Sequence, residues 1–216
     1  MKLSSTCEVQ SGYTARTRLE PTTKGGVPAI QLRDLHGEED FDPSGAHLYA
    51  LGPSFERYWA GPGDVLFRSR GERNTAVAIA PGAKTAAIAI LPLMVLRPDP
   101  KLIDGKYLAW FINQPASQRY FDKCARGTRL RMIPKGCLDD LEVPLPDLPT
   151  QKLVVEIDSL ARHERALTQQ LAAKKLKLTS FALLEQVRKA QPQGNGAGRL
   201  VARQARSPAG KVERTN

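Results

Sequence analysis

The chain has 216 residues, enough for one ordinary domain and an extension, and a formal net charge of +10. Its apolar runs are all shorter than the ~20 residues of a transmembrane helix, and its first twelve residues (MKLSSTCEVQSG) lack the apolar stretch of a secretory signal. These features argue against a membrane or secreted protein, so we expect a cytoplasmic one.

Short β-type runs dominate the first hundred residues. After a strand near Cys7 and a polar loop, strands are predicted at residues 27–32 (VPAIQL), 63–67 (GDVLF), 76–80 (AVAIA) and 85–96 (TAAIAILPLMVL). Pro92 interrupts the last of these runs, which indicates an edge strand or a bulge because proline cannot donate to a sheet ladder.

The pattern becomes helical from Asp104. Apolar residues lie at helical spacing up to Ile112, Pro115 is typical of the first turn of a second helix, and Gly127 is typical of its end. Residues 128–133 (TRLRMI) then alternate as in a strand. Aromatic side chains such as Tyr58 and Trp110 could stack on bases, but their apolar neighbours favour packing in the core.

A long amphipathic helix is predicted to follow, with Thr150 as its N-cap. Its apolar residues recur at alternating spacings of four and three, which is typical of a coiled-coil seam with charged interruptions at Glu164 and Lys174. The seam comprises Leu153, Ile157, Leu160, Leu167, Leu171, Leu178 and Phe181. At 1.5 Å per residue such a helix is about 55 Å long, which favours a partner helix over packing on its own domain.

The sequence therefore predicts an α+β chain in three parts: a mixed α/β domain over residues 1–149, a long coiled-coil helix over 150–188, and a basic, disordered tail over 189–216. Residues 1–150 hold 19 Lys and Arg against 17 Asp and Glu, so most of the excess positive charge lies in the helix and tail. This distribution fits contact with a polyanion, although many solvated helices are also basic.

Signatures of catalysis or metal binding are absent from the sequence. Phosphate-binding loops, nucleophile elbows, zinc-protease motifs and dinucleotide fingerprints are not found. The three cysteines (Cys7, Cys124 and Cys137) are odd in number and lack CxxC spacing, so we expect free thiols, no disulfide framework and no metal site.

Several segments, taken in order, resemble one target-recognition half of the DNA specificity subunit of type I restriction-modification systems. EVQSGYTARTRLE at Glu8 is similar to that family's opening strand and basic loop, VPAIQLRDL at Val27 to its second strand, and PGDVLFRSRG at Pro62 to its glycine-bounded strand. The stretch from Tyr107 to Gln151 is similar to the family's helix pair, Ile-Pro step and entry into a spacer helix. The resemblance covers about Glu8 to Leu184.

The resemblance implies a target-recognition domain followed by a spacer helix, in a non-catalytic subunit that binds double-stranded DNA. Adenine methyltransferase partners would carry the S-adenosylmethionine, so no cofactor is expected in this chain, and a restriction and translocase subunit could join them. Full-length members carry two recognition domains, whereas this sequence shows one. We therefore expect a homodimer that reads an inverted bipartite site, with a heterodimer of two half-subunits as the alternative.

Two basic clusters are predicted to contact DNA, because arginine suits guanine edges and phosphates and asparagine suits adenine. The predicted contact residues are Lys24, Gln31, Arg33, Arg68, Ser69, Arg70, Arg73, Asn74, Arg126, Thr128, Arg129 and Arg131. Two other readings stay open from the residues alone: a dimeric coiled-coil adaptor that binds protein and whose basic tail is incidental, and an enzyme with a divergent site.

Overall fold

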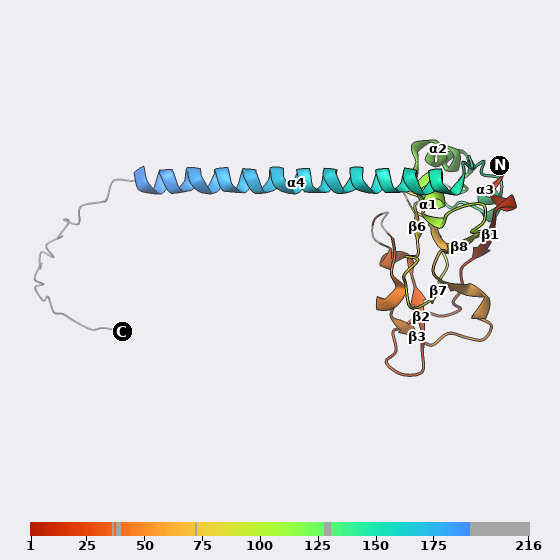
Figure 1. The fold of residues 1–216 in the computed structure, drawn as a ribbon. Helices are drawn as coiled ribbons and strands as arrows, with labels where there is room; N and C mark the ends of the chain where they lie inside the picture. Colours follow the sequence, from red (N-terminus) through yellow and green to blue (C-terminus); the bar gives the residue numbers. More distant parts are fainter. Residues whose placement is uncertain (36, 38–39, 72, 128–130, 191–216) are drawn as a thin grey trace, which may run out of the picture. The chain divides into compact units, whose positions relative to one another are not determined.

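A computed structural model describes residues 1–35, 37, 40–71, 73–127 and 131–190 (Figure 1). It divides into two units, Met1–Glu164 and Arg165–Asn216, and the strands found in the described ranges all belong to the first. Within these ranges, no helix combines the length and apolar character that crossing a membrane requires.

The first sheet has four antiparallel strands in the order β1-β8-β5-β6. Both faces of this sheet are buried, which explains why β5 reads as a continuous apolar run rather than an alternating one. Val65 and Phe67 point into one core and Leu66 into another, as the two-residue period of a strand requires. The strands are β1 Cys7–Ser11, β8 Leu93–Pro98, β5 Val65–Arg68 and β6 Ala76–Ala78.

The second sheet is smaller and has the order β3-β2-β7-β4, with β2 and β7 parallel. Its strands are β3 Leu48–Tyr49, β2 Val27–Ile30, β7 Ala87–Ala89 and β4 Trp59–Ala60. Ile30, Ala87 and Ala89 join Leu66 and Val95 of the first sheet in one core cluster. The edge strand predicted at Pro92 is wrong: the run from Thr85 divides there into β7, which lies between β2 and β4, and β8, which lies between β1 and β5.

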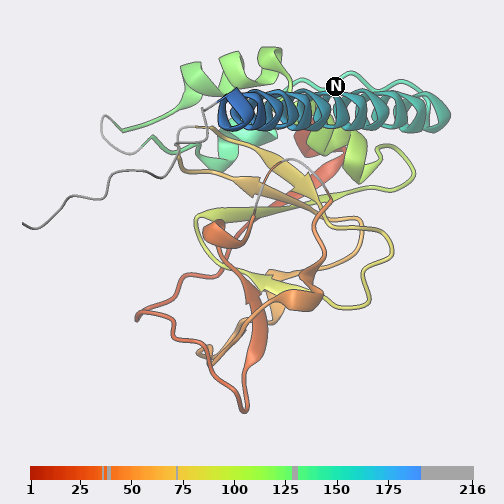
Figure 2. The same ribbon diagram turned by 90° about the vertical axis from the view of Figure 1, so that its left-hand side faces the viewer.

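Three helices cover the opposite side of the first sheet, away from β2, β3 and β7 (Figures 1 and 2). They are α1 Gly105–Asn113, α2 Pro115–Cys124 and α3 Lys135–Asp139, and the 3-10 turns are η1 Leu3–Ser5, η2 Leu32–Asp34, η3 Pro43–Gly45 and η4 Glu56–Tyr58. Asp104 caps α1 by accepting hydrogen bonds from two backbone amides. Asn113 fixes its other end to β6 through two hydrogen bonds of 2.8 Å with Ala76.

The aromatic side chains pack as predicted. Tyr107 and Phe121 are buried, and Trp110, Phe111 and Tyr120 pack against the same core. Tyr58 and Trp59 are half-buried against a third, smaller cluster on the second sheet. Pro115 stands at the first turn of α2, also as predicted.

The long helix α4 spans Leu148–Ala190, 43 residues or about 64 Å along its own axis. The predicted N-cap at Thr150 is wrong: Asp147 precedes the helix and accepts a hydrogen bond from the Thr150 amide at 3.0 Å. The aspartate before Leu148 and Pro149 caps the helix three residues earlier than the threonine would. The predicted α+β class with a long C-terminal helix is confirmed, whereas the predicted disordered tail falls mostly on residues 191–216, outside the described ranges.

Gln151 anchors the first turn of α4 within the first unit. Its side chain is fully buried. It accepts a hydrogen bond from the Asp104 amide at 2.8 Å and donates to the carbonyl oxygens of Leu102 (3.0 Å) and Pro146 (2.8 Å). These three hydrogen bonds therefore tie the first turn of α4 to the loop before α1 and to the segment before α4.

The predicted free thiols need a correction. Cys124 at the end of α2 and Cys137 in α3 form a disulfide, and Cys7 alone is free and buried. Sequence spacing could not reveal the pair, because the two residues meet only after α2 and α3 pack beside each other. Burial raises the pKa of the Cys7 thiol to about 12, so that sulfur stays protonated at neutral pH.

Candidate nucleic-acid interface

One end of the first sheet gathers the loops that carry the predicted basic residues. Because neighbouring strands are antiparallel, the ends of β1 and β5 meet the starts of β8 and β6 at the same edge. Hydrogen bonds join these loops: Gly12 donates to the Leu93 carbonyl at 2.9 Å, and the Ser69 amide donates to the Pro92 carbonyl at 3.2 Å.

The two predicted basic clusters converge at this edge. Arg126 and Met132 exchange two backbone hydrogen bonds of 3.0 Å, and the Ile133 amide donates to the Ser69 carbonyl at 2.8 Å. Arg70 pairs with Met132 in an isolated β-bridge. We call the resulting surface the basic rim. It consists of Arg70, Arg73, Arg126 and Arg131, four exposed arginines from two segments that are about 60 residues apart in sequence.

The four arginines of the basic rim differ in how their charge is compensated. Arg131 lies 3.1 Å from an Asp122 carboxylate oxygen and also donates to the Asp122 carbonyl at 2.8 Å. Within the described residues, Arg70, Arg73 and Arg126 make no ion pair. Three guanidinium groups thus keep their charge and most of their donors for an external acceptor such as a phosphate or a base edge.

Three predicted contact residues of the first cluster lie partly or wholly below this surface. Ser69 is buried and its hydroxyl donates to the Pro92 carbonyl at 2.6 Å, and Asn74 is buried and donates to the Arg68 carbonyl at 3.0 Å. Arg68 is half-buried, and its Nε is a buried donor that finds no acceptor among the described residues. The prediction that Ser69 and Asn74 contact DNA is therefore revised: their bonds hold the loop that carries Arg70 and Arg73.

The remaining predicted residues lie on the second sheet or outside the described ranges. Gln31 follows β2 and is the N-cap residue of η2. The residue before it, Ile30, accepts a hydrogen bond from the Ile90 amide at 2.9 Å. Arg33 is exposed but donates to the Tyr49 hydroxyl at 3.0 Å, and Lys24 lies in the loop before β2, at its other end. Thr128 and Arg129 lie outside the described residues.

Sequence reasoning missed Arg16, which lies in the segment that follows β1. It is exposed and, like Arg18 two residues further on, forms no ion pair among the described residues. The alternating TARTRLE pattern was the available signal, since two arginines with no neighbouring acid before Glu20 indicate a basic loop. The described residues contain no group of three or more His, Cys, Asp or Glu that could hold a metal ion.

Comparison with known proteins identifies solved structures that share this architecture. No protein-family model and no curated protein matches the sequence. Solved structures do match. One, from work on complex assembly and conformational transition of the type I R-M system, has a TM-score of 0.61 at 19% identity, covering 84% of this chain and 42% of that chain. The HsdS subunit from Thermoanaerobacter tengcongensis has a TM-score of 0.56 at 20% identity, covering 78% and 38%.

The chain has the fold of a type I specificity subunit. It spans about two fifths of the length of each of these two relatives. The likeness in fold that the sequence motifs indicated is therefore confirmed, whereas residue roles and partners are not transferred by a match of such low identity. The basic rim and the exposed face of α4 must carry any functional conclusion on their own chemistry.

Proposed function

We propose that this chain is a non-catalytic, sequence-specific DNA-binding subunit of a type I-like restriction-modification system. It would direct a partner adenine methyltransferase, and a restriction subunit where one is present, to a target site. The observation that carries the proposal is the basic rim: four exposed arginines converge at one sheet edge of a domain with the specificity-subunit fold.

The chemistry of the basic rim fits duplex DNA better than a protein partner. Arginine is the residue that most often pairs bidentately with guanine, and it binds phosphate with the same planar fork. Among the described residues, Arg70, Arg73 and Arg126 have no ion pair that contact with DNA would have to break. We also propose that the protein is cytoplasmic, because a subunit with this role must have access to the DNA of the cell.

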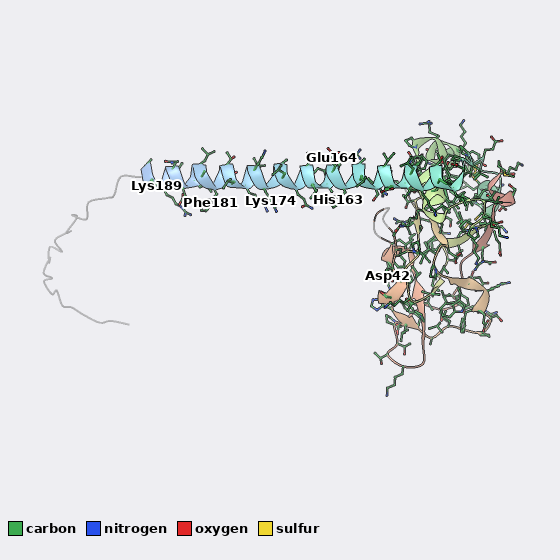
Figure 3. All side chains as sticks on the ribbon, in the orientation of Figure 1. Asp42, His163, Glu164, Lys174, Phe181 and Lys189 are labelled. Carbon is green, nitrogen blue, oxygen red and sulfur yellow. A yellow bond between two sulfur atoms is a disulfide. The ribbon has the colours of Figure 1, made fainter. Side chains whose placement is uncertain are left out.

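The apolar face of α4 supports a dimer. Leu153, Ile157, Leu160, Leu167, Leu171, Leu178 and Phe181 lie along it, and each is more than half exposed. Glu164 and Lys174, both labelled in Figure 3, occupy the two charged positions of the same four-and-three spacing. Burying each large side chain stabilises an interface by roughly 1.5–3 kcal/mol. Burial of these seven side chains on each helix would therefore strongly favour association of two helices. We propose pairing with a second copy, whose twofold symmetry would present two identical heads to an inverted site.

A second apolar face appears in the last third of α4 and supports a further partner. Leu176, Leu183 and Val187 are 69%, 62% and 59% exposed. At 100° per residue they lie roughly opposite Leu171 and Leu178 on the same helix. A helix that pairs through one face leaves the other for a different protein. We propose that this protein is the methyltransferase subunit, which would supply the S-adenosylmethionine.

The test is the pattern of N6-methyladenine in the native organism with and without this gene. The proposal predicts that deletion removes methylation at one bipartite sequence and that the intact gene restores it. Arg70→Ala with Arg126→Ala should fail to restore it at equal protein level. An unchanged methylation pattern after deletion would contradict the proposed role, and a dimeric adaptor that binds protein would then account better for the exposed helix.

A further inference from the structure

The first unit also has a cavity of about 270 Å³ that none of the four arginines of the basic rim lines. It lies between the segment that follows β1 and the segment that precedes β4. We call it the tyrosine pocket. The lining residues are Tyr13, Thr14, Ala15, Arg16, Thr17, Leu19, Ala50, Gly52, Pro53, Ser54, Arg57 and Tyr58.

The walls of the tyrosine pocket are held in place by bonds between its two segments. The rings of Tyr13 and Tyr58 meet edge to face with centroids 5.5 Å apart, and the Tyr13 hydroxyl accepts a hydrogen bond from the Gly52 amide at 3.0 Å. The Arg57 guanidinium lies 4.8 Å over the Tyr58 ring, and the Arg57 carbonyl accepts from Arg97 at 3.0 Å. The site is therefore preformed, and binding of a ligand would cost little conformational entropy for ordering the pocket side chains.

The lining chemistry selects an anion joined to a small ring. Arg16 and Arg57 are cationic, three hydroxyl groups come from Thr14, Thr17 and Ser54, and the described lining contains no carboxylate. Guanidinium and hydroxyl donors without an acid suit a phosphate. The tyrosine rings and Leu19 offer apolar surface for an attached sugar or base. The volume lies just below the range of pockets for drug-sized ligands, so it fits one nucleotide unit rather than a large cofactor.

One residue that lines the tyrosine pocket, Ser54, has a strained backbone conformation. Ser54 has a φ of 66°, the left-handed conformation, which costs a residue other than glycine roughly 1–2 kcal/mol. It is the only such non-glycine residue among those described. Strained backbone occurs preferentially at ligand sites, where the surrounding structure imposes it.

The position of the tyrosine pocket connects it to the basic rim. The Leu91 amide donates to the Tyr13 carbonyl at 2.9 Å, and the next residue, Pro92, accepts from the Ser69 amide at 3.2 Å. Tyr13 in the pocket wall and Ser69, which precedes Arg70, therefore attach to one turn. A single DNA strand that crosses this turn would meet both surfaces.

We propose that the tyrosine pocket binds one nucleotide unit of the DNA strand that lies on the basic rim, with its phosphate on Arg16 and its sugar or base against Tyr58. This inference rests on the proposed function. The same chemistry would accept a free mononucleotide, so the experiment must separate the two sources.

The test uses the full chain and a duplex that the wild type selects from a random pool. Single uncharged methylphosphonate linkages are placed at successive positions of that duplex. Arg16→Ala removes the cation from the pocket, and Arg18→Ala is the matched control, because Arg18 lies two residues away and does not line the pocket. Ala50→Phe fills the pocket without changing charge, and thermal unfolding shows that each variant is folded.

We expect Arg16→Ala to lower duplex affinity about tenfold and Arg18→Ala less than threefold. One methylphosphonate position should weaken the wild type but leave Arg16→Ala unaffected, because the two changes remove the same contact. Ala50→Phe should weaken binding with the salt dependence nearly unchanged.

Equal effects of the Arg16 and Arg18 substitutions, with no linkage-specific loss, would overturn the pocket assignment while leaving DNA binding intact. Failure of the wild type to select any duplex would instead refute the proposed function. Deoxyadenosine monophosphate is the probe for the other source: if it binds the wild type but not Ala50→Phe, and DNA affinity is the same in both, the assignment to a DNA strand is overturned.

Discussion

Replacing Arg126 by alanine should weaken DNA binding much more than replacing Arg131, although both are exposed arginines of the basic rim. Asp122 lies 3.1 Å from the Arg131 guanidinium and partly neutralises it, whereas Arg126 has no ion pair within the described residues. The phosphate-binding contribution of Arg131 is therefore already reduced before DNA arrives. Replacing Asp122 by alanine should have the opposite effect and tighten binding.

The magnitudes follow from counterion release. Each phosphate contact contributes about 0.9 to the slope of the logarithm of the binding constant against the logarithm of salt concentration. Removing Arg70 and Arg126 together should lower that slope by about 1.8, and each loss of a charge-assisted bond should weaken binding roughly tenfold or more. Arg131→Ala should change the slope by less than about 0.5.

The assay is fluorescence anisotropy of a labelled duplex, titrated at several salt concentrations between about 50 and 300 mM, where the electrostatic contribution is large. Lys84→Ala is the matched control, since this exposed lysine follows β6 at the end of the strand away from the basic rim. Equal slopes for Lys84→Ala, Arg126→Ala and Arg131→Ala would refute the reasoning, because they would show that the basic rim makes no localised contact.

Three other predictions concern α4. Gln151→Leu should destabilise the first unit by about 2–4 kcal/mol in urea unfolding, because it strands a buried amide and two carbonyls; a loss below about 0.5 kcal/mol would contradict the role of this anchor. Leu160→Glu with Leu171→Glu should convert a dimer into a monomer in sedimentation equilibrium, whereas the same change at Ala172 and Leu183, off the proposed seam, should leave it dimeric. Hydrogen bonds from Thr150 hold the pKa of Asp147 below its usual value, so the cap stabilises the helix above about pH 4 and this stabilisation is lost as pH falls through the lowered pKa. The gap in melting temperature between wild type and Asp147→Ala should therefore be constant near neutral pH and narrow under acid conditions, and a gap independent of pH would contradict the cap.

Much of the fold was predictable because local signals dominate it. The apolar runs that became β5 and β6 are bounded by glycine, proline or polar residues, and Pro115 marks the start of α2. The errors arose where tertiary packing decides. Thr150 and Asp147 are both good capping residues, and only the path of the chain before Leu148 selects the aspartate. The pairing of Cys124 with Cys137 likewise depends on how α2 and α3 pack.

The candidate site was predictable as composition but not as geometry. The arginine clusters were visible in the sequence, but no local pattern could show that Arg70 and Met132 pair across about 60 residues. Ser69 and Asn74 have the donors that suit base recognition, and their burial follows from the turn at Pro92 and the packing of the loop. Arg16 was missed because other residues that line the tyrosine pocket, such as Arg57, belong to a segment about 40 residues away in sequence.

Sequence-specific duplex binding by the full chain is the central claim, and selection from a random duplex pool followed by measurement of affinity tests it most directly. The account predicts one enriched sequence that binds at least about a thousandfold more tightly than an unrelated duplex at the same salt concentration. It also predicts that Arg70→Ala with Arg126→Ala removes most of that preference. Equal affinity for all duplexes, or no measurable binding at low salt, would contradict it.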